Sequence, residues 1–538
     1  MPLIPVKPFK TPRRAAAAQT AQVAVIPAPT GGLNYRDPIS AMQPTDALVL
    51  TNFIPRQQGV ELRKGWQAYA GAVEVASVAQ SVESIFSYTA PDPADNRVFM
   101  ATNGKIYDVT SGGAPVDMTP SGTGSTDDEW WTTQFSTAAG TYLLAVSPGA
   151  GYWTYDATGG WVDRTASTVG LSTSVRTVAV WKRRIWFTVE GDSRVYYMRN
   201  VNDIQGHADA LPMGSILRNG GYISALFNWT IDAGFSVDDF LVAVGTEGDI
   251  GVWEGTDPTN AATFNLKGVW YVGPVPRHGT YFTPFGGDVM IVSELGLVPM
   301  SRLITGQYSQ DVQAGGPASK IQSVFAPLVR KLRNEKFFNV FVVPSSEVLV
   351  IKLPNDGGTY RQFAMNVTTG AWCDFEGMPM RCATVIDGEL YFGTDDGLTC
   401  KGLYGDRDAV DSVGAGGNYV EGEMQGAFTH FGTPAQNKKF GMVRPIFIAL
   451  SAPSIKVQIN TQFQLTPIGG SPFYSADDTG LWDAAVWNVA TWAGQNTYQG
   501  WAGTAGLGYY GSLCMKVRGL PQTVFTSAHV MTEIGGVM

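Results

Sequence analysis

The sequence predicts an all-β protein whose central part is a β-propeller. Charged residues make up only 15% of the chain, glycine accounts for 63 of 538 residues, and aromatic residues for 12%. Such a composition is typical of many short strands joined by tight turns. Short β-rich runs recur from about residue 75 to 410, often with one aromatic residue and one glycine per hairpin. This recurrence favours four-stranded sheets packed radially around an axis.

The repeated unit is a short apolar run, a turn, and a second run that often ends in Trp or Tyr. Glycine in these turns supplies the positive φ that a tight hairpin requires. Four turns of this kind are expected at Asn103-Gly104, Asp249-Ile250-Gly251, Glu294-Leu295-Gly296 and Asp387-Gly388. Because five to seven such units occur, we predict about six blades. A β-sandwich would give similar strand spacing, but the number of units favours the propeller.

The first element, residues 1–30, is a proline-rich arm with no acidic residue. Its basic residues are Lys7, Lys10, Arg13 and Arg14. The arm lacks the continuous apolar stretch of a secretory signal. No run of eighteen apolar residues occurs anywhere in the chain, so no membrane span is expected. We expect the arm to pack on another subunit, and a disordered tail is the open alternative.

Residues 31–74 follow, with a Gly-Gly turn, a loop closed by Asp37-Pro38, a predicted short helix and a short strand. Thr45 or Asp46 is placed to cap the helix, because a short side-chain oxygen accepts from the first free backbone N–H groups. Pro55 prevents the helix from continuing. The segment holds no paired nucleophile and base, no metal cluster and no phosphate loop, which indicates a scaffold.

Two later elements complete the predicted architecture. Residues 319–335 interrupt the propeller with a helix whose apolar positions recur at three and four, capped by Ser319 and kinked by Pro327. Its basic side either touches DNA or is a solvated face. Residues 411–538 predict a separate sandwich-like platform domain with a loop rich in Trp and Gly. The tryptophans of that loop either contact another protein or cover the domain's own core.

The residue inventory gives little support to catalysis. Four cysteines match no metal spacing and are expected as buried free thiols; they are Cys373, Cys382, Cys400 and Cys514. No two of the four histidines have metal-ligand spacing, and neither a nucleophile elbow nor a nucleotide-binding loop occurs. We therefore expect no enzyme, no catalytic residue, no metal and no cofactor.

One cluster is an exception, because acidic residues stand beside two tryptophans. Asp127, Asp128 and Glu129 directly precede Trp130 and Trp131. Glycosidases use paired carboxylates, and aromatic rings stack on sugars. A turn closed by carboxylates before a strand is the more common origin of such a pattern. Both interpretations remain open.

Four stretches of the chain carry a further signal. The first combines Gly31-Gly32-Leu33-Asn34-Tyr35-Arg36-Asp37, Pro44-Thr45-Asp46-Ala47, Asn52-Phe53-Ile54-Pro55 and Arg63-Lys64-Gly65-Trp66. The others are 366–373 with 387–393, 430–432 with 440–445, and 482–487 with Trp492. In this order they resemble the tail nozzle, or tail tubular protein B, family of short-tailed bacteriophages (podoviruses). The alternative is a generic β protein rich in Gly and Trp.

The resemblance suggests certain motif positions as candidates for assembly contacts. They are Asn34, Arg36, Asp37, Asp46, Arg63, Trp372, Arg444, Trp482, Trp487 and Trp492. It also implies a structural protein of the virion tail, made in the host bacterial cytoplasm and assembled as a homohexameric ring at the distal end of the tail tube. The implied partners are a tail adaptor or upper tail-tube ring, tail fibres or spikes, and genomic DNA that passes through the lumen during ejection.

The charge of the chain is compatible with this role. The formal net charge is −9, whereas proteins that grip nucleic acid usually present a basic field. An acidic wall would let DNA pass without sequence-specific binding, although ordinary solubility explains the same charge. Two other functions remain as alternatives: a glycan-binding or glycan-cleaving propeller used in host recognition, and a cellular propeller adaptor.

Overall fold

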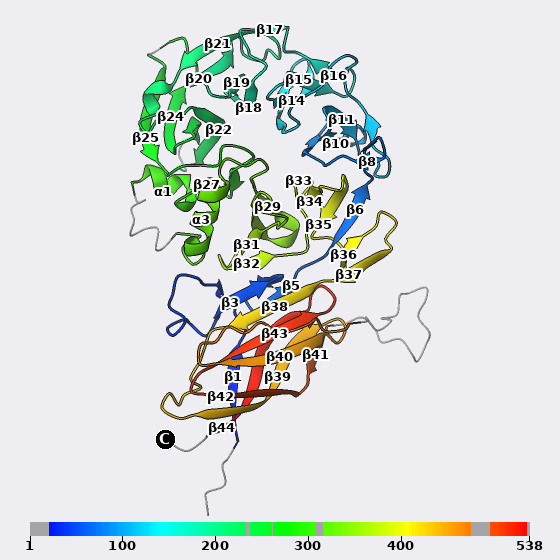
Figure 1. Ribbon diagram of the computed structural model, residues 1–538. Coiled ribbons are helices and arrows are strands. Elements are labelled where there is room, and N and C mark those ends of the chain that lie inside the picture. The colour runs from blue at the N-terminus through cyan, green and yellow to red at the C-terminus, as the bar shows by residue number, and fades with distance from the viewer. Residues whose placement is uncertain (1–20, 233–236, 261, 307–315, 475–494, 535–538) are drawn as a thin grey trace, which may run out of the picture.

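The computed structural model describes residues 21–232, 237–260, 262–306, 316–474 and 495–534. Its strands form a ring of radial sheets and a β platform stacked against one side of that ring (Figure 1). The predicted β-propeller, with an additional β domain, is therefore confirmed. In Figure 1 the two ends of the described chain both lie in the platform.

The first half of the ring contains four sheets, and the first-named strand of each lies innermost. The first sheet consists of β9 (Ser84–Tyr88), β10 (Arg97–Thr102), β11 (Lys105–Asp108) and β12 (Val116–Asp117). The second consists of β13 (Trp131–Thr137), β14 (Gly140–Ser147), β15 (Gly151–Asp156) and β16 (Gly160–Asp163). The third consists of β18 (Val175–Trp181), β19 (Arg184–Val189), β20 (Arg194–Met198) and β21 (Gly206–Pro212), with β17 (Thr168–Val169) outside. The fourth consists of β22 (Ile223–Asp232), β23 (Val237–Gly245), β24 (Asp249–Gly255) and β25 (Phe264–Tyr271).

The second half of the ring is less regular. A three-stranded sheet consists of β26 (Phe282–Phe285), β27 (Asp288–Ser293) and β28 (Gly296–Pro299). The next sheet consists of β29 (Asn339–Val343), β30 (Val348–Lys352), β31 (Gln362–Asn366) and β32 (Trp372–Phe375). The last consists of β33 (Cys382–Ile386), β34 (Glu389–Gly393), β35 (Thr399–Gly402) and β6 (Trp66–Ala70), extended by β36 (Arg407–Val410) and β37 (Gly416–Tyr419). Within the described ranges, six blades thus have four strands or more, and the shorter β26–β28 sheet lies between two of them.

The ring is closed by a strand from the start of the chain. β6 pairs antiparallel with β35, so the last blade combines residues 66–70 with residues 382–402. The inner strand of that blade, β33, lies beside β9 of the first blade. A small hairpin of β7 (Glu74–Val75) and β8 (Val78–Ala79) connects the closing strand to the first blade. This arrangement joins the two ends of the propeller by backbone hydrogen bonds.

The predicted hairpin turns follow local chemistry. Asn103 and Gly104 have φ values of 51° and 77°, and Asp387 and Gly388 have 50° and 80°. Both pairs form two-residue hairpin turns, as predicted. Such turns need residues that adopt positive φ. Glu294 and Leu295 link β27 to β28. The turn predicted at 249–251 is wrong, because those residues begin β24 and the turn is made by residues 246–248.

The predicted helical insertion is present as α3 (Gln322–Leu332), with Pro327 inside it. Its apolar face, which includes Phe325, Val329 and Leu332, is buried. The expected cap at Ser319 is wrong, since the N-cap position is Ile321 and carries no side-chain hydrogen bond. One shorter α-helix is α1 (Met300–Ile304), and single 3-10 turns occur at Pro93–Asp95, Gly214–Ile216 and Pro344–Ser346.

The helix predicted after Pro44 is also wrong, because residues 46–51 form the strand β3 (Asp46–Thr51). β3 pairs in parallel with β2 (Gly32–Leu33) and antiparallel with β38 (Glu421–Gly426). The Asp46 carboxylate accepts hydrogen bonds from side chains instead of from helical N–H groups. Three consecutive apolar residues after Ala47 suit a buried strand, and tertiary pairing overrides the local capping signal.

The platform is built from both ends of the chain. One of its sheets contains β4 (Phe53–Pro55), β5 (Val60–Leu62), β44 (Val524–Ile534), β39 (Lys438–Ala449), β41 (Asn496–Gln499), β1 (Gln22–Pro27) and β42 (Ala502–Gly508). The other sheet continues from β32 of the propeller through β3 and β38 to β43 (Gly511–Arg518) and β40 (Ser454–Thr461). A single hydrogen-bonded sheet therefore crosses from the propeller into the platform.

Three smaller predictions can be placed on this fold. The end of the N-terminal arm forms β1, which pairs with β44, whereas Lys7, Lys10, Arg13 and Arg14 lie outside the described residues. All four cysteines are free and buried, as predicted. None of the helices in the described ranges has the length and apolar character needed to cross a membrane.

Candidate functional site

The first group of motif residues surrounds the side chain of Asn34, which is 1% exposed. Its Nδ2 donates to Asp37 Oδ2 at 2.8 Å and to Asp46 Oδ2 at 2.7 Å. Its Oδ1 accepts from the backbone N–H groups of Arg36 and Asp37, both at 3.0 Å. All four hydrogen bonds that an amide side chain can make are therefore present. The buried Asn34 side chain therefore fixes the conformation of the loop through these hydrogen bonds.

Charged side chains complete this loop. Arg36 Nε donates to Asp37 Oδ1 at 2.8 Å, and hydrogen bonds from Arg36 and Asn34 lower the pKa of Asp37 to about 2. Lys320 Nζ donates to Asp46 Oδ1 at 2.7 Å and to the carbonyl of Gly31 at 2.9 Å. Because Lys320 lies two residues before the start of α3, these bonds tie the motif loop to the helical insertion.

Trp372 lies against the opening turn of the same motif. Gly32 has φ 73°, and a Cβ built there would lie 2.5 Å from the Trp372 carbonyl oxygen. Only glycine allows this approach of two backbones. The Trp372 indole donates from Nε1 to the carbonyl of Pro317 at 2.7 Å. The structure therefore brings together the first and second stretches, although more than 300 residues separate them in the sequence.

Arg63 forms a second buried centre, with a side chain that is 0% exposed. Its Nη1 and Nη2 donate to the two carboxylate oxygens of Asp408, each at 2.7 Å. Nε donates to Asn52 Oδ1 at 2.7 Å, and the remaining N–H groups reach the carbonyls of Lys64 and Glu376. All five guanidinium donors are used.

A ring contact makes a further link between the first two stretches. Trp66, the first residue of the closing strand β6, packs edge-on against Phe392 with ring centroids 5.6 Å apart. Trp66 Nε1 also donates to the carbonyl of Gly377 at 2.7 Å. The end of the first stretch and the end of the second thus meet in the last blade.

The remaining motif candidates are separate from this cluster. Arg444, on β39 in the platform, donates from Nη2 to His529 Nδ1 at 2.6 Å, and its guanidinium lies 5.2 Å from the centroid of the Trp501 ring. Trp482, Trp487 and Trp492 lie outside the described residues. We define the motif joint as Asn34, Asp37, Asp46, Arg63, Trp66 and Trp372, the motif residues that link propeller and platform.

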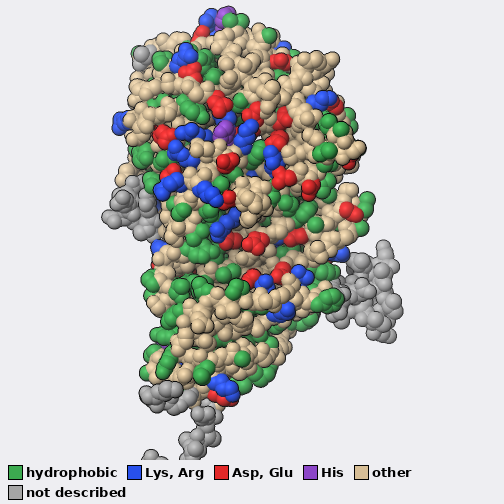
Figure 2. Space-filling view, viewed as in Figure 1, with side chains coloured by type: hydrophobic (Ala, Val, Ile, Leu, Met, Phe, Trp, Pro, Cys, Tyr) green, Lys and Arg blue, Asp and Glu red, His purple; other side chains and the backbone are tan. Residues whose placement is uncertain are grey.

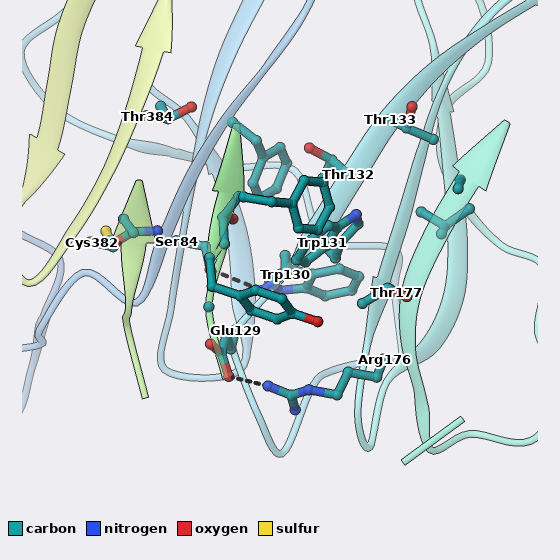
Figure 3. A pocket seen from close by; sticks show the side chains of 18 of the residues that line it. Ser84, Glu129, Trp130, Trp131, Thr132, Thr133, Arg176, Thr177, Cys382 and Thr384 are labelled. Carbon is teal, nitrogen blue, oxygen red and sulfur yellow. Dashed lines mark hydrogen bonds and ion pairs between the residues drawn. The ribbon is translucent and has the colours of Figure 1, made fainter. Parts of the chain in front are cut away.

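The propeller axis contains a cavity of about 530 Å³. Residues from the inner strands of all seven sheets line it, including Trp131 of β13, Phe282 of β26 and Asn339 of β29. Trp131 and Phe282 pack together, with ring centroids 5.6 Å apart. Figure 3 shows Trp130 and Trp131 above an ion pair between Glu129 and Arg176 at one end of this cavity.

That ion pair is nearly buried. Arg176 Nη2 lies 3.1 Å from Glu129 Oε2 and 2.7 Å from His278 Nδ1. His278 Nδ1 also lies 3.4 Å from Glu129 Oε2. Burial alone would raise the pKa of Glu129, but His278 and Arg176 outweigh it and lower the pKa to about 2. The carboxylate is therefore ionised at neutral pH.

Other charged pairs surround the same mouth of the propeller, where the inner strands begin. Arg381 pairs with Glu83 at 2.9 Å, and Lys336 with Asp127 at 2.8 Å. Glu247 pairs with both Arg277 and Arg333. Figure 2 shows acidic and basic side chains gathered over the centre of the propeller. We call this set the ionic collar: Glu83, Asp127, Glu129, Arg176, Glu247, Arg277, His278, Arg333, Lys336 and Arg381.

The acidic residues predicted beside the tryptophans therefore separate. Glu129, Trp130 and Trp131 line the cavity, whereas Asp127 and Asp128 are not among its lining residues. Asp128 Oδ2 accepts from the backbone N–H of Gly104 at 2.6 Å, and burial raises the pKa of its carboxyl to about 6. Of the carboxylates in this cluster, only Glu129 lines the cavity; a second lining carboxylate, Glu83, comes from before β9 and pairs with Arg381. Across the described ranges, His, Cys, Asp and Glu form no group of three that would hold a metal ion.

The partners of several predicted residues have no signal in the sequence. Lys320 and Asp408 bind predicted motif residues, and Arg176 and His278 bind Glu129, yet each comes from a distant part of the chain. No local spacing relates Arg63 to Asp408. One usable signal was the position of charged residues directly before predicted inner strands, because parallel inner strands place their first residues at one mouth.

Comparisons with known proteins give the following matches. No protein-family model matches the chain, and no curated protein matches it in sequence. Among solved structures, the WD40 β-propeller domain of Doa1 is similar, with 11% identity over 63% of this chain and 96% of that chain, and a TM-score of 0.39. BBS1N in complex with ARL6DN gives 11% identity, coverages of 64% and 98%, and a TM-score of 0.37. A chain of the mitotic checkpoint complex gives 12%, 62% and 95%, with a TM-score of 0.34.

Proposed function

We propose that this chain is a structural subunit of a short bacteriophage tail and forms the nozzle ring at the distal end of the tail tube. In this proposal six copies surround a central lumen through which genomic DNA leaves the virion. One face of the ring docks on a tail adaptor or upper tail-tube ring, and the outer surface seats fibres or spikes. The chain contributes geometry and no bond-making chemistry.

The observation that carries the proposal is the motif joint. The first two stretches that resemble the nozzle family lie far apart in the sequence, yet Gly32 packs on Trp372 and Trp66 packs on Phe392. Their polar residues are consumed by internal hydrogen bonds, as in Asn34 and Arg63. Residues used in this way hold two bodies in a fixed orientation, which suits a ring subunit whose shape determines the assembly.

The propeller axis supports a lumen between copies instead of within one copy. The axial cavity has a volume of about 530 Å³, in the size range of small-molecule pockets, and the ionic collar surrounds one end of it. A DNA duplex needs a continuous passage, so the proposed path follows the axis of the assembled ring. The net charge of −9 is compatible with a wall to which DNA does not adhere.

The test is to locate the chain in the particle that carries it. An epitope-tagged copy is produced in bacteria during phage growth, particles are purified, and gold-labelled antibody is imaged by negative stain. The proposal expects label at the tip of a short tail, and a cryo-electron microscopy map of that tip with six copies around the DNA path. Label on the capsid, or particles that lack the chain, would show that the proposed function is wrong.

A matched pair of variants sharpens this test. Gly32→Val places a side chain against the Trp372 backbone in the motif joint. Gly357→Ala changes a glycine with a similar positive φ of 61° but open surroundings, so the pair separates the contact with Trp372 from backbone strain. The Gly32→Val chain should be excluded from particles, and the Gly357→Ala chain should be incorporated like the wild type. Equal incorporation of both variants would contradict the role given to the motif joint.

A further inference from the structure

One sheet of the platform is apolar on both of its faces. Its strands β1, β44, β39 and β42 lie side by side in that order, in the part of the platform away from the propeller (Figure 1). The inner face packs in the core through buried residues such as Ile26, Val443 and Val530. An antiparallel sheet with one face in solvent usually alternates apolar and polar residues. The outer face of this sheet departs from that rule.

The outer face carries exposed apolar side chains from the strands at its two sides. Val23 and Val25 on β1 are 57% and 62% exposed, and Leu507 on β42 is 63% exposed. Trp501, directly before β42, is 42% exposed. Apolar side chains gathered on one exposed surface mark a contact site. We define the platform face as Val23, Val25, Met442, Trp501, Leu507 and Met531.

A row of cross-strand neighbours runs across this face. Val23 is opposite Met531, which is opposite Met442, and both methionines are partly exposed. Met442 is in turn opposite Gly503, where a built Cβ meets nothing within 4 Å. Methionine side chains adapt to the shape of a partner, and the open position at Gly503 leaves room beside them. The platform face therefore offers an apolar track with a tryptophan near one end.

The segment that precedes β1 suits this track in sequence. Residues 1–20 lie outside the described residues, and Ala21 joins them to β1 at the edge of the face. Proline occurs at positions 2, 5 and 8, and an apolar residue at positions 3, 6 and 9. A period of three is that of a polyproline II helix, so the sequence predicts two adjacent apolar rows. The third row contains Ile4, Lys7 and Lys10.

The chemistry of proline favours packing on a face over pairing at an edge. Because proline has no N–H, a strand with proline at every third position would lose part of its ladder of hydrogen bonds. Proline-rich segments instead dock through their side chains on apolar grooves that contain aromatic residues. Trp501 supplies such an aromatic residue on the platform face.

The distances suit an arm that folds back on its own chain. The row from β1 to β42 spans three interstrand spacings, about 14 Å. Residues 11–21 connect β1 to the proline-rich part, and a flexible linker of about eleven residues has a root-mean-square length of about 18 Å. Effective concentration is highest when the linker length matches the span. This match favours the arm of the same chain over that of another copy.

We propose that the platform face binds residues 2–10 of the same chain, with the two apolar rows of the arm against Met442 and Met531 and its basic residues toward solvent. The arm then covers apolar surface that would otherwise favour association with other molecules. This inference is independent of the nozzle proposal, because the free subunit is sufficient to test it.

The test is photo-crosslinking from the arm of the full chain. The amino acid p-benzoylphenylalanine replaces Phe9, the protein is illuminated, and the joined residues are identified by mass spectrometry. We expect crosslinks to residues of the platform face in a product with the mass of one chain. The same amino acid in place of Gln19, in the linker, is the control and should give few crosslinks to the centre of the face.

A matched pair of glycine variants tests the face itself. Gly503→Arg places a charge in the apolar row without a clash in its own chain, so it should lower the crosslinking yield from position 9 at least about 5-fold. Gly469→Arg, at an exposed platform glycine that is also in open surroundings, should leave the yield unchanged. Circular dichroism confirms that both variants are folded. If Gly503→Arg does not fold, Leu507→Arg replaces it, at a side chain that is mostly exposed.

Three results would overturn the proposal. The first is a crosslinked product with the mass of two chains, which would assign the face to the arm of a neighbouring copy. The second is an absence of crosslinks to the platform face from position 9, which would place the arm elsewhere. The third is that Gly469→Arg lowers the yield as much as Gly503→Arg does.

Discussion

At the scale of single residues, Arg63 illustrates how this chain uses its few charges. Its side chain is fully buried, and all five N–H groups donate to neighbours, two of them to Asp408. A buried ion pair contributes little net stability compared with apolar residues, but removing one partner leaves the other charge uncompensated. Arg63 therefore contributes to the defined geometry of the motif joint more than to net stability.

Replacing this arginine gives the first prediction. Arg63→Met should lower the free energy of unfolding by about 3–5 kcal/mol, because it leaves the Asp408 carboxylate without its bidentate partner. Urea unfolding followed by tryptophan fluorescence measures the effect. The control is Arg36→Met, at a partly exposed ion pair, with an expected loss below about 1 kcal/mol. Equal losses in the two variants would contradict the structural role of Arg63.

Asp128 gives the second prediction, which concerns pH. Burial raises the pKa of its carboxyl from 3.8 to about 6, so the folded state binds this proton more tightly than the unfolded chain does. The free-energy cost of ionising the buried Asp128 carboxyl grows as pH rises from about 4 to 6 and then stays constant. Asp128→Asn keeps an acceptor for the Gly104 N–H and removes that cost.

Asp128→Asn should therefore stabilise the protein above pH 7 and have little effect near pH 4. The expected gain is about 1–2 kcal/mol, given that one pKa unit corresponds to about 1.4 kcal/mol and the group retains some solvent contact. Urea unfolding of both proteins at the two pH values measures it. A difference that is the same at both pH values would refute the burial explanation.

At this scale, the sequence identified structurally important residues more successfully than it predicted their contacts. Asn34, Asp37 and Asp46 were selected together and do lie together, because their loop is local in the chain. The partner of Arg63 lies 345 positions away, and no periodicity in one sequence relates the two. Glu129 and Trp131 were found as neighbours of a turn, but their position on an axis depends on the closed ring.

At the scale of elements, the closing strand β6 determines whether the propeller is a ring or an open row of sheets. It is the fourth strand of the last blade, and Trp66 at its start anchors it on Phe392 and Gly377. Without β6, the β35 edge would expose unpaired backbone groups. β6 thus pairs the backbone groups of the β35 edge and joins the first and last parts of the propeller.

Weakening this strand gives the third prediction. Trp66→Ala should destabilise the protein by about 3–5 kcal/mol through loss of a buried aromatic side chain. Hydrogen exchange measured by mass spectrometry should show lost protection over residues 382–402, the rest of that blade. Trp501→Ala in the platform serves as the control and should leave the exchange of those residues unchanged. Uniform loss of protection throughout the chain would argue against a local closing role.

Elements governed by local chemistry were predicted well, and those governed by distant pairing were not. The turns at Asn103-Gly104 and Asp387-Gly388 follow from residues that adopt positive φ, whatever surrounds them. Residues 46–51 were predicted as a helix from a capping pattern, yet they form β3 between strands from three other parts of the chain. Pairing partners outside the segment decided its conformation.

At the scale of the whole molecule, propeller and platform share one hydrogen-bonded sheet. β32 of the propeller is followed in that sheet by β3 and β38 of the platform. A domain pair joined only by a linker would unfold in separate steps, whereas a shared sheet and core couple the two. The repeated hairpins predicted the propeller, but a sheet that crosses between bodies has no signature in the sequence.

This continuity gives the fourth prediction. Differential scanning calorimetry of the wild-type chain should show one main transition. Gly32→Val, which forces the β2 turn away from the Trp372 backbone, should split it into two. Gly357→Ala, at a glycine with a similar positive φ of 61° but open surroundings, should retain one transition. Two well-separated transitions in the wild-type chain would show that the bodies are energetically independent.

The order of the strands along the chain has a consequence for biosynthesis. β6 leaves the ribosome long before its partner β35, and β1 long before β44, so neither ring nor platform can be completed on a growing chain. A prematurely terminated polypeptide lacks the partners of both early strands and stays a substrate for proteases. Truncation before residue 524 should therefore yield a chain that proteases degrade, even though every blade of the propeller is present in it.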